Sequence, residues 1–102
     1  MKKEIITPEG LSKPLGIYSE AVKVNGNNLL FISGITARDK NGSIVGQGDM
    51  KRQTEQVLEN MKVILDSVGA TFDNIVKVTV FVTGLSHFKE IHEVRARYFK
   101  KD

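Results

Sequence analysis

The stretch NNLLFISGIT, residues 27–36, places a Ser-Gly pair inside an apolar run of the kind that forms a buried strand. A glycine within a strand marks either a bulge or a place where another group approaches the bare main chain. At that point Ser33 could offer a hydroxyl to a ligand, and Gly34 could offer unobstructed backbone groups. The pattern leaves both interpretations open, a structural bulge and the wall of a binding pocket.

A second set of reactive side chains lies in the helix expected near the C-terminal end. Phe88, Ile91 and Tyr98 recur there at helical spacing and form an apolar stripe. Arg95 falls within this stripe, and His92 lies beside it. A purely structural helix seldom carries a cation and an imidazole along its inward face. These two residues therefore either border a cleft or interface, or lie at the edge of the stripe and extend into solvent.

The other reactive residues exclude several kinds of chemistry. The chain has no cysteine, so it can form no disulfide, thiol nucleophile or thiolate metal site. His87 and His92 are five residues apart, whereas two helical imidazoles that share a metal ion are four apart. The nine glycines form neither a dinucleotide-binding fingerprint nor a phosphate-binding loop. We therefore expect no metal and no organic cofactor.

Composition indicates a single soluble domain, which we assign to residues 1–102. The 40% hydrophobic and 26% charged content is ordinary, and no apolar run approaches the roughly 20 residues that span a bilayer. The opening MKKEII lacks the apolar segment of a secretory signal, so we expect a cytoplasmic protein with no membrane partner. The net charge is +3 with basic and acidic residues intermixed, so a nucleic-acid partner is not expected.

Turn residues outline the elements that would position these side chains. Strands expected at residues 20–24 and 29–32 flank Asn25-Gly26, a dipeptide typical of tight hairpins. A second turn at residues 40–42 should lead into a short third strand.

A helix should follow, with Asp49 as its N-cap and Gly69 at its C-terminal end. Its apolar positions recur at helical spacing: Val57, Leu58, Met61, Ile64, Leu65 and Val68. Alternating valines in residues 75–82 predict the clearest strand of the chain, and Ser86 should cap a second helix that runs to about Phe99. The order β-β-β-α-β-α predicts an α+β fold, a mostly antiparallel sheet with two helices packed on one face.

The strand expected at residues 29–32 is apolar on both faces, with Leu29 and Phe31 on one side and Leu30 and Ile32 on the other. Two helices can cover only one face of so small a sheet. The second face needs another copy of the chain, so we predict a homo-oligomer.

Several spaced blocks together resemble the YjgF/Rid family of reactive-intermediate deaminases. They are GIYSEAV, LLFISGIT, QTEQVLENMKVIL, GATFDNIVKVTVFVT and FKEIHEVRARYF, and they cover nearly the whole chain. The resemblance implies a chorismate-mutase-like fold and a homotrimer with active sites in the clefts between subunits. It also implies cofactor-free hydrolysis of 2-imino or enamino acids, such as 2-iminobutanoate and 2-iminopropanoate, to 2-keto acids and ammonia.

The same resemblance implies a set of substrate-binding residues. Ser33 and Gly34 would line the pocket, and Tyr18, in the block GIYSEAV, would form another wall. His92 stands where the family usually carries Asn, and Arg95 where it usually carries Tyr. These five residues are the candidate site, and which residues catalyse is left open.

The family's last two strands carry an Arg that holds the substrate carboxylate and a Glu that positions water, and this chain ends at Asp102, before them. We therefore expect a truncated version of the fold. A two-pronged Arg–carboxylate contact is the usual way to hold such a substrate, and water needs an oriented acceptor. Arg95 could replace the missing Arg, and Glu90 or Glu93 could hold water.

Three functions remain open on this evidence. The first is an imine deaminase. The second is a non-catalytic trimer that binds a small 2-imino or 2-keto acid. The third is an RNA-acting protein, which the older family names, endoribonuclease L-PSP and translation inhibitor, suggest. We rank them in that order.

Overall fold

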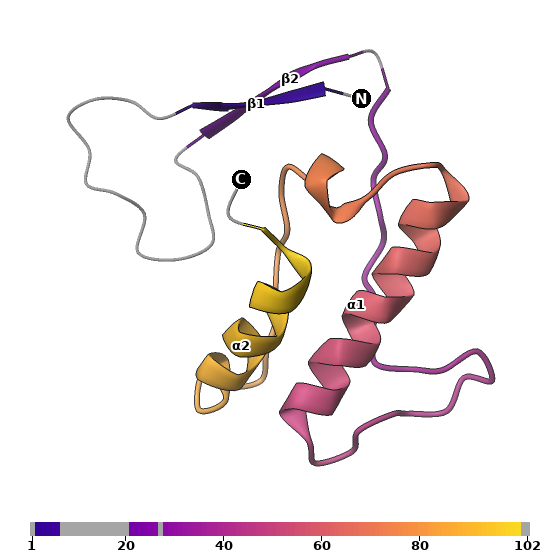
Figure 1. The fold of residues 1–102 in the computed structure, drawn as a ribbon. Coiled ribbons are helices and arrows are strands. Elements are labelled where there is room, and N and C mark those ends of the chain that lie inside the picture. Colours follow the sequence, from indigo (N-terminus) through magenta and orange to yellow (C-terminus); the bar gives the residue numbers. More distant parts are fainter. Residues whose placement is uncertain (1, 7–20, 27, 101–102) are drawn as a thin grey trace.

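The computed structural model describes residues 2–6, 21–26 and 28–100. It is an α+β structure whose two helices lie side by side on the same side of a two-stranded sheet (Figure 1). The elements in chain order are β1 (Lys2–Ile6), β2 (Ala21–Asn25), α1 (Met50–Ser67), the short 3-10 helix η1 (Phe72–Asn74) and α2 (Phe88–Tyr98).

The strand predicted at residues 20–24 is confirmed as β2, but its partner differs from the prediction. β2 pairs antiparallel with β1, with Lys2 opposite Asn25 and Ile6 opposite Ala21. The pairing with residues 29–32 that the Asn-Gly dipeptide predicted is therefore wrong. The sequence of β1, KKEII, mixes three charged residues with two isoleucines and has no alternation, so the pattern did not mark it as a strand.

Two further predicted strands are not formed. In the described part of the chain, residues 29–32 and 75–82 pair with no neighbouring strand. The predicted third strand is reduced to one antiparallel bridge between Arg38 and Ile44, around the expected turn. Alternation indicates which faces a strand would bury, but a strand forms only where another segment accepts its hydrogen bonds.

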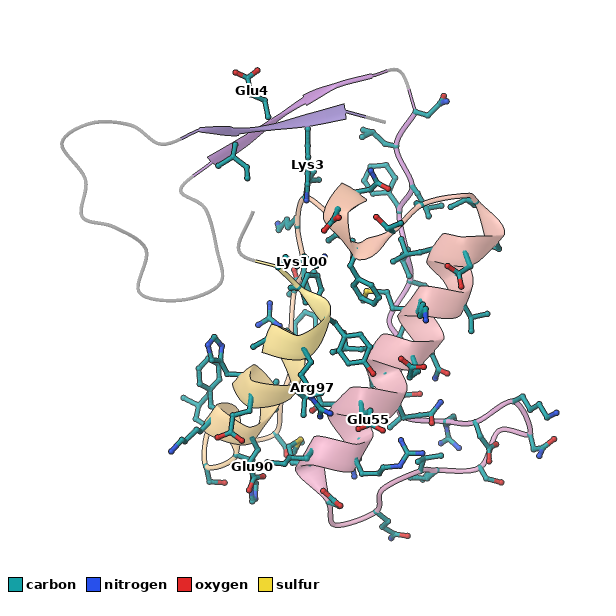
Figure 2. The ribbon with its side chains drawn as sticks, viewed as in Figure 1. Lys3, Glu4, Glu55, Glu90, Arg97 and Lys100 are labelled. Carbon is teal, nitrogen blue, oxygen red and sulfur yellow. The ribbon has the colours of Figure 1, made fainter. Side chains whose placement is uncertain are left out.

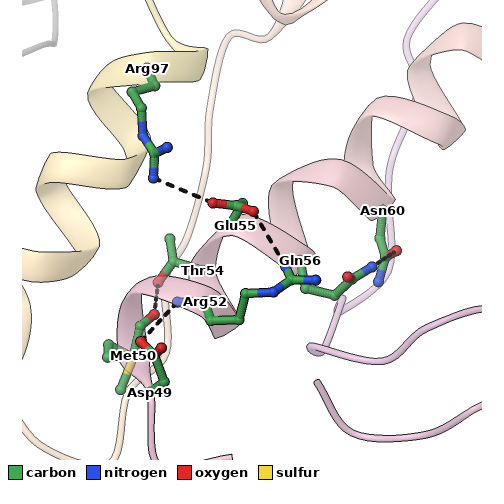
Figure 3. Close-up of polar contacts among 8 residues, drawn as sticks. All are labelled: Asp49, Met50, Arg52, Thr54, Glu55, Gln56, Asn60 and Arg97. Atoms are coloured by element: carbon green, nitrogen blue, oxygen red, sulfur yellow. Dashed lines mark hydrogen bonds and ion pairs between the residues drawn. The ribbon is translucent and has the colours of Figure 1, made fainter. Parts of the chain in front are cut away.

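Both predicted ends of α1 are confirmed. Asp49 is the N-cap, and its side chain accepts a hydrogen bond of 3.1 Å from the backbone nitrogen of Arg52 (Figure 3). Past the other end, Gly69 adopts a φ of +71°, and the next residue, Ala70, donates its N–H to the Leu65 carbonyl at 2.9 Å. This 6→1 bond at a left-handed glycine stops the helix and buries Ala70 beneath it.

The predicted start of the second helix is wrong by one residue. His87, not Ser86, is the N-cap of α2, and its side chain makes no capping bond. The imidazole Nδ1 of His87 instead lies 3.1 Å from a carboxylate oxygen of Glu90. Ser86 lies one position too early for its hydroxyl to act as an N-cap acceptor.

The core lies between the helices. α1 and α2 contact each other, and each buries two apolar side chains, Leu58 and Leu65 from α1 and Ile91 and Val94 from α2. Val94 is the most buried, with 1% of its surface exposed. The stripe predicted for α2 is thus shifted, because Phe88 remains 54% exposed while Val94 takes an inward position.

The loop before α1 provides a test of the packing. Gly46 has a φ of +75°, and a Cβ there would lie 2.9 Å from both the Arg52 Cβ and the Gln53 nitrogen. We expect Gly46→Ala to lower the free energy of unfolding by about 2–4 kcal/mol, measured by urea denaturation. Gly42→Ala is the control, since φ is +82° but nothing lies within 4 Å, and it should cost roughly 1–2 kcal/mol. Equal losses would contradict the close approach.

Candidate functional site

The structure places the predicted site residues in two separate groups. Tyr18 lies outside the described residues. Ser33 and Gly34 are exposed in the segment before the Arg38 bridge, whereas His92 and Arg95 are half-buried on α2. Among the described residues, no hydrogen bond or ion pair joins the first group to the second. The pocket predicted from these residues therefore stays a prediction.

Nothing in the described part of the chain requires a glycine at position 34, in the Ser-Gly pair. Gly34 is not among the glycines with positive φ, and a Cβ built on it meets no atom within 4 Å. The same segment is tied to α1 further along, where Asn60 Nδ2 donates to the carbonyl oxygens of Thr36 at 3.3 Å and Arg38 at 2.8 Å. Among the described residues, neither a positive φ nor a close neighbour requires a glycine at position 34.

An open hollow of about 270 Å³ lies next to this segment, and no sequence pattern predicted it. Its polar side chains are already occupied: Arg38 Nη1 donates to the Gly42 carbonyl at 2.7 Å, and Gln53 Nε2 donates to the Gly46 carbonyl at 2.9 Å. None of the predicted site residues lines it, the lining being Thr36, Ala37, Arg38, Ile44 and Gln53. It is a weak candidate for a ligand site, since those donors already serve the loop.

The groups on α2 form a more promising arrangement. The rings of Phe88 and His92 stack at 6.3 Å and 17°, and the guanidinium carbon of Arg95 lies 5.6 Å from the centre of the Phe99 ring. The spacing of these four residues places them on one face of the helix, which we call the α2 stripe. Sequence reasoning found His92 and Arg95 but missed the roles of Phe88 and Phe99, although all four recur at helical spacing.

Arg95 has a polar atom without a partner in the described part of the chain. Among the described residues its buried Nε has no hydrogen-bond acceptor, and Arg95 enters no ion pair there. A buried donor without an acceptor costs roughly 1–3 kcal/mol. Phe99 is held from its other side by Phe72, with ring centres 5.2 Å apart in an edge-to-face contact. The guanidinium therefore rests on a fixed aromatic ring.

The acidic side chains near Arg95 in the sequence are engaged elsewhere. Glu93 pairs with Lys51 Nζ at 2.9 Å, and Glu90 faces His87. Hydrogen bonding to Lys51 lowers the pKa of Glu93 and raises the pKa of Lys51. The two carboxylates that could have held a water molecule for Arg95 thus already have cationic or imidazole partners.

A second ion pair joins the helices on the same flank. Glu55 of α1 lies 3.6 Å from Arg97 of α2 and 3.4 Å from its neighbour Arg52 (Figures 2 and 3). These side chains are exposed, so each pair contributes little to stability. Their position shows which flank of α2 faces α1.

Tyr98, the last residue of α2, contacts the short helix η1. Its ring packs against Phe72 with centres 5.5 Å apart. Burial, followed by a hydrogen bond to Glu59, raises the pKa of the Tyr98 hydroxyl to about 12. The hydroxyl therefore remains protonated at neutral pH and supplies no base to a reaction.

The arrangement defines a class of protein before any relative is considered. It is a small α+β protein with two helices on one side of an antiparallel sheet. No helix in the described ranges is long and apolar enough to cross a membrane.

Comparison with known proteins assigns the family. Residues 10–102 match the model of the family described as Endoribonuclease L-PSP. A RutC family protein of Pyrococcus horikoshii is 46% identical over 98 residues, which are 95% of this chain and 75% of that protein. The chloroplastic Reactive Intermediate Deaminase A of Arabidopsis thaliana is 40% identical over 100 residues, 97% of this chain and 52% of that protein.

Solved structures support the same family. The Rid-family protein YyfB of Yersinia pestis superposes with a TM-score of 0.78 at 31% identity, covering 96% of this chain and 77% of that one. The chain belongs to the Rid family, as its sequence blocks indicated, and the expected α+β fold is confirmed.

Titration of Tyr98 tests the contacts at the end of α2. In a Tyr18→Phe variant, phenolate absorbance should appear at about pH 12 for the folded protein and near 10 after unfolding. Because folding raises this pKa, the protonated Tyr98 hydroxyl makes its full contribution to stability below pH 10, and that contribution is lost as the pH rises towards 12. Glu59→Gln should lower the folded pKa only in part, since burial is the larger cause. A folded pKa near 10 would contradict the burial of Tyr98.

Proposed function

We propose that this chain hydrolyses 2-imino acids, with 2-iminobutanoate and 2-iminopropanoate as substrates, to 2-keto acids and ammonia. The observation that carries the proposal is its 40% identity, over 97% of its length, to a plant protein named Reactive Intermediate Deaminase A. That relative is longer, so its activity is extended to this chain as a proposal. The absence of a thiol nucleophile is compatible with this reaction, because water is the nucleophile.

The reaction needs two things from the protein. Water adds to the imine carbon, a carbinolamine forms, and the C–N bond breaks as the nitrogen leaves as ammonia. A cation must hold the neighbouring carboxylate in place during these steps, and an acceptor must orient the water. Arg95 is the candidate for the carboxylate, since its guanidinium has no acidic partner among the described residues. The acceptor for water is not assigned.

We also propose that the chain acts as a cytoplasmic homotrimer with its sites in the clefts between subunits. Large apolar side chains support assembly, since Phe31 is 87%, Phe81 91% and Leu85 76% exposed in one chain. In such an assembly, a cleft between subunits would bring Ser33 and Gly34 of one protomer together with the α2 stripe of its neighbour.

The proposal is tested by following 2-iminobutanoate released from threonine by a threonine dehydratase. We expect added protein to speed its conversion to 2-oxobutanoate well above the rate in buffer, with light scattering on the same sample reporting a trimer. Arg95→Gln should lower kcat/KM by about tenfold or more, because a charged hydrogen bond is lost. Arg97→Gln is the matched control, as Arg97 pairs with Glu55 on the other flank.

The same sample separates the remaining candidates. A trimer that binds 2-oxobutanoate but leaves the imine unchanged would refute hydrolysis and support a ligand-binding protein. Cleavage of single-stranded RNA by the purified trimer, without imine hydrolysis, would favour the activity named in the family description.

The bare main chain at Gly34 yields a separate prediction. Gly34→Ala should leave the free energy of unfolding within about 1 kcal/mol of the parent, because the added Cβ meets nothing within the chain. If substrate lies on this backbone, the variant should raise KM by roughly tenfold in the dehydratase assay. Gly84→Ala, also free of contacts within 4 Å, is the control and should keep the parent KM. Unchanged kinetics in both variants would remove Gly34 from the site.

A further inference from the structure

The α2 stripe has unused binding capacity at both of its ends. At one end Arg95 carries a positive charge and a buried Nε–H that has no acceptor among the described residues, and its guanidinium lies over the Phe99 ring. At the other end Phe88 is stacked with His92 yet remains 54% exposed. A cation without a described anionic partner and an exposed pair of rings are complementary to different parts of one ligand.

The helix geometry sets the axial distance between Arg95 and the nearer ring of the stacked pair, that of His92. His92 and Arg95 are three residues apart, which is about 4.5 Å along a helix axis. An acid whose carboxylate is separated from a planar ring by two or three carbon atoms spans a similar length. A small aliphatic acid could reach Arg95 but not the rings.

The charge count favours a carboxylate over a phosphate. Among the described residues, Arg97 and Lys51 pair with Glu55 and Glu93, whereas Lys89 of α2 enters no ion pair. Lys89 lies six residues before Arg95, about 120° around the helix from it, and so does not share the face of the α2 stripe. On that face, one guanidinium without a described anionic partner matches one negative charge, whereas a phosphate monoester carries close to two. A carboxylate that accepts from both Nε and a terminal nitrogen would also satisfy the orphan donor, in the two-pronged geometry that arginine favours.

We propose that the α2 stripe is a specificity site for 2-imino acids with a planar aromatic side chain, with the carboxylate on Arg95 and the ring on Phe88 and His92. The inference rests on the proposed function for the identity of the reacting group. It goes further in naming the ring-bearing members of that substrate class as preferred and Phe88 as a specificity-determining residue.

Binding of stable 2-keto acids tests the site without requiring hydrolysis. Calorimetry on the assembled protein should show phenylpyruvate bound roughly tenfold or more tightly than 2-oxobutanoate. The NMR signal of the Arg95 Nε–H should shift when either acid binds, because the donor gains an acceptor. Equal affinity for the two acids, or an Nε–H signal that stays in place, would overturn the inference.

Variants separate the two ends of the site. Arg95→Gln should weaken both acids by roughly tenfold, and Phe88→Ala should remove the preference for phenylpyruvate while leaving 2-oxobutanoate binding intact. Arg97→Gln is the control and should change neither affinity. If Arg95→Gln does not fold, Arg95→Lys keeps the charge but loses the two-pronged contact, and affinity unchanged in that variant would count against the site.

The outcome is distinct from that of the proposed function. Selective binding of phenylpyruvate without imine hydrolysis would keep the site and refute the reaction. Hydrolysis of 2-iminobutanoate that is no slower than hydrolysis of the phenylalanine-derived imine would keep the reaction and refute the aromatic preference.

Discussion

The packing of α2 against α1 is the constraint on which the rest of the molecule depends. Ile91 and Val94 are buried on α2, and they fix how that helix is rotated about its axis. Successive residues of a helix are about 100° apart, so the α2 stripe must lie roughly a quarter of a turn from the buried face. The inward pair of residues therefore determines where His92 and Arg95 can act.

The sequence predicted those features that depend on neighbours along the chain. The cap at Asp49 and the stop at Gly69 were found because helix ends are closed by local hydrogen bonds. Strand pairing was not found, since β1 joins β2 across an intervening segment and its sequence has no alternation. Residues 75–82 alternate clearly, yet alternation does not supply the segment against which a strand would pair.

The candidate site shows the same division. His92 and Arg95 stood out as polar residues near an apolar stripe, which spacing alone reveals. The surroundings of these residues could not be predicted from spacing. The stacking on Phe88 and the lack of a described partner for the Arg95 Nε depend on side-chain conformations and on which anions lie nearby.

The two flanks of α2 differ in how their charges are used. On one flank Glu93 and Arg97 pair with α1, and this pairing removes both from chemistry with a ligand. On the other flank Arg95 has an aromatic ring for support and no described carboxylate to neutralise it. A charge held against a rigid ring is oriented before any ligand arrives, so less conformational entropy is lost on binding. The same helix thus carries the ion pairs with α1 on one flank and, on the other, a guanidinium with no described anionic partner.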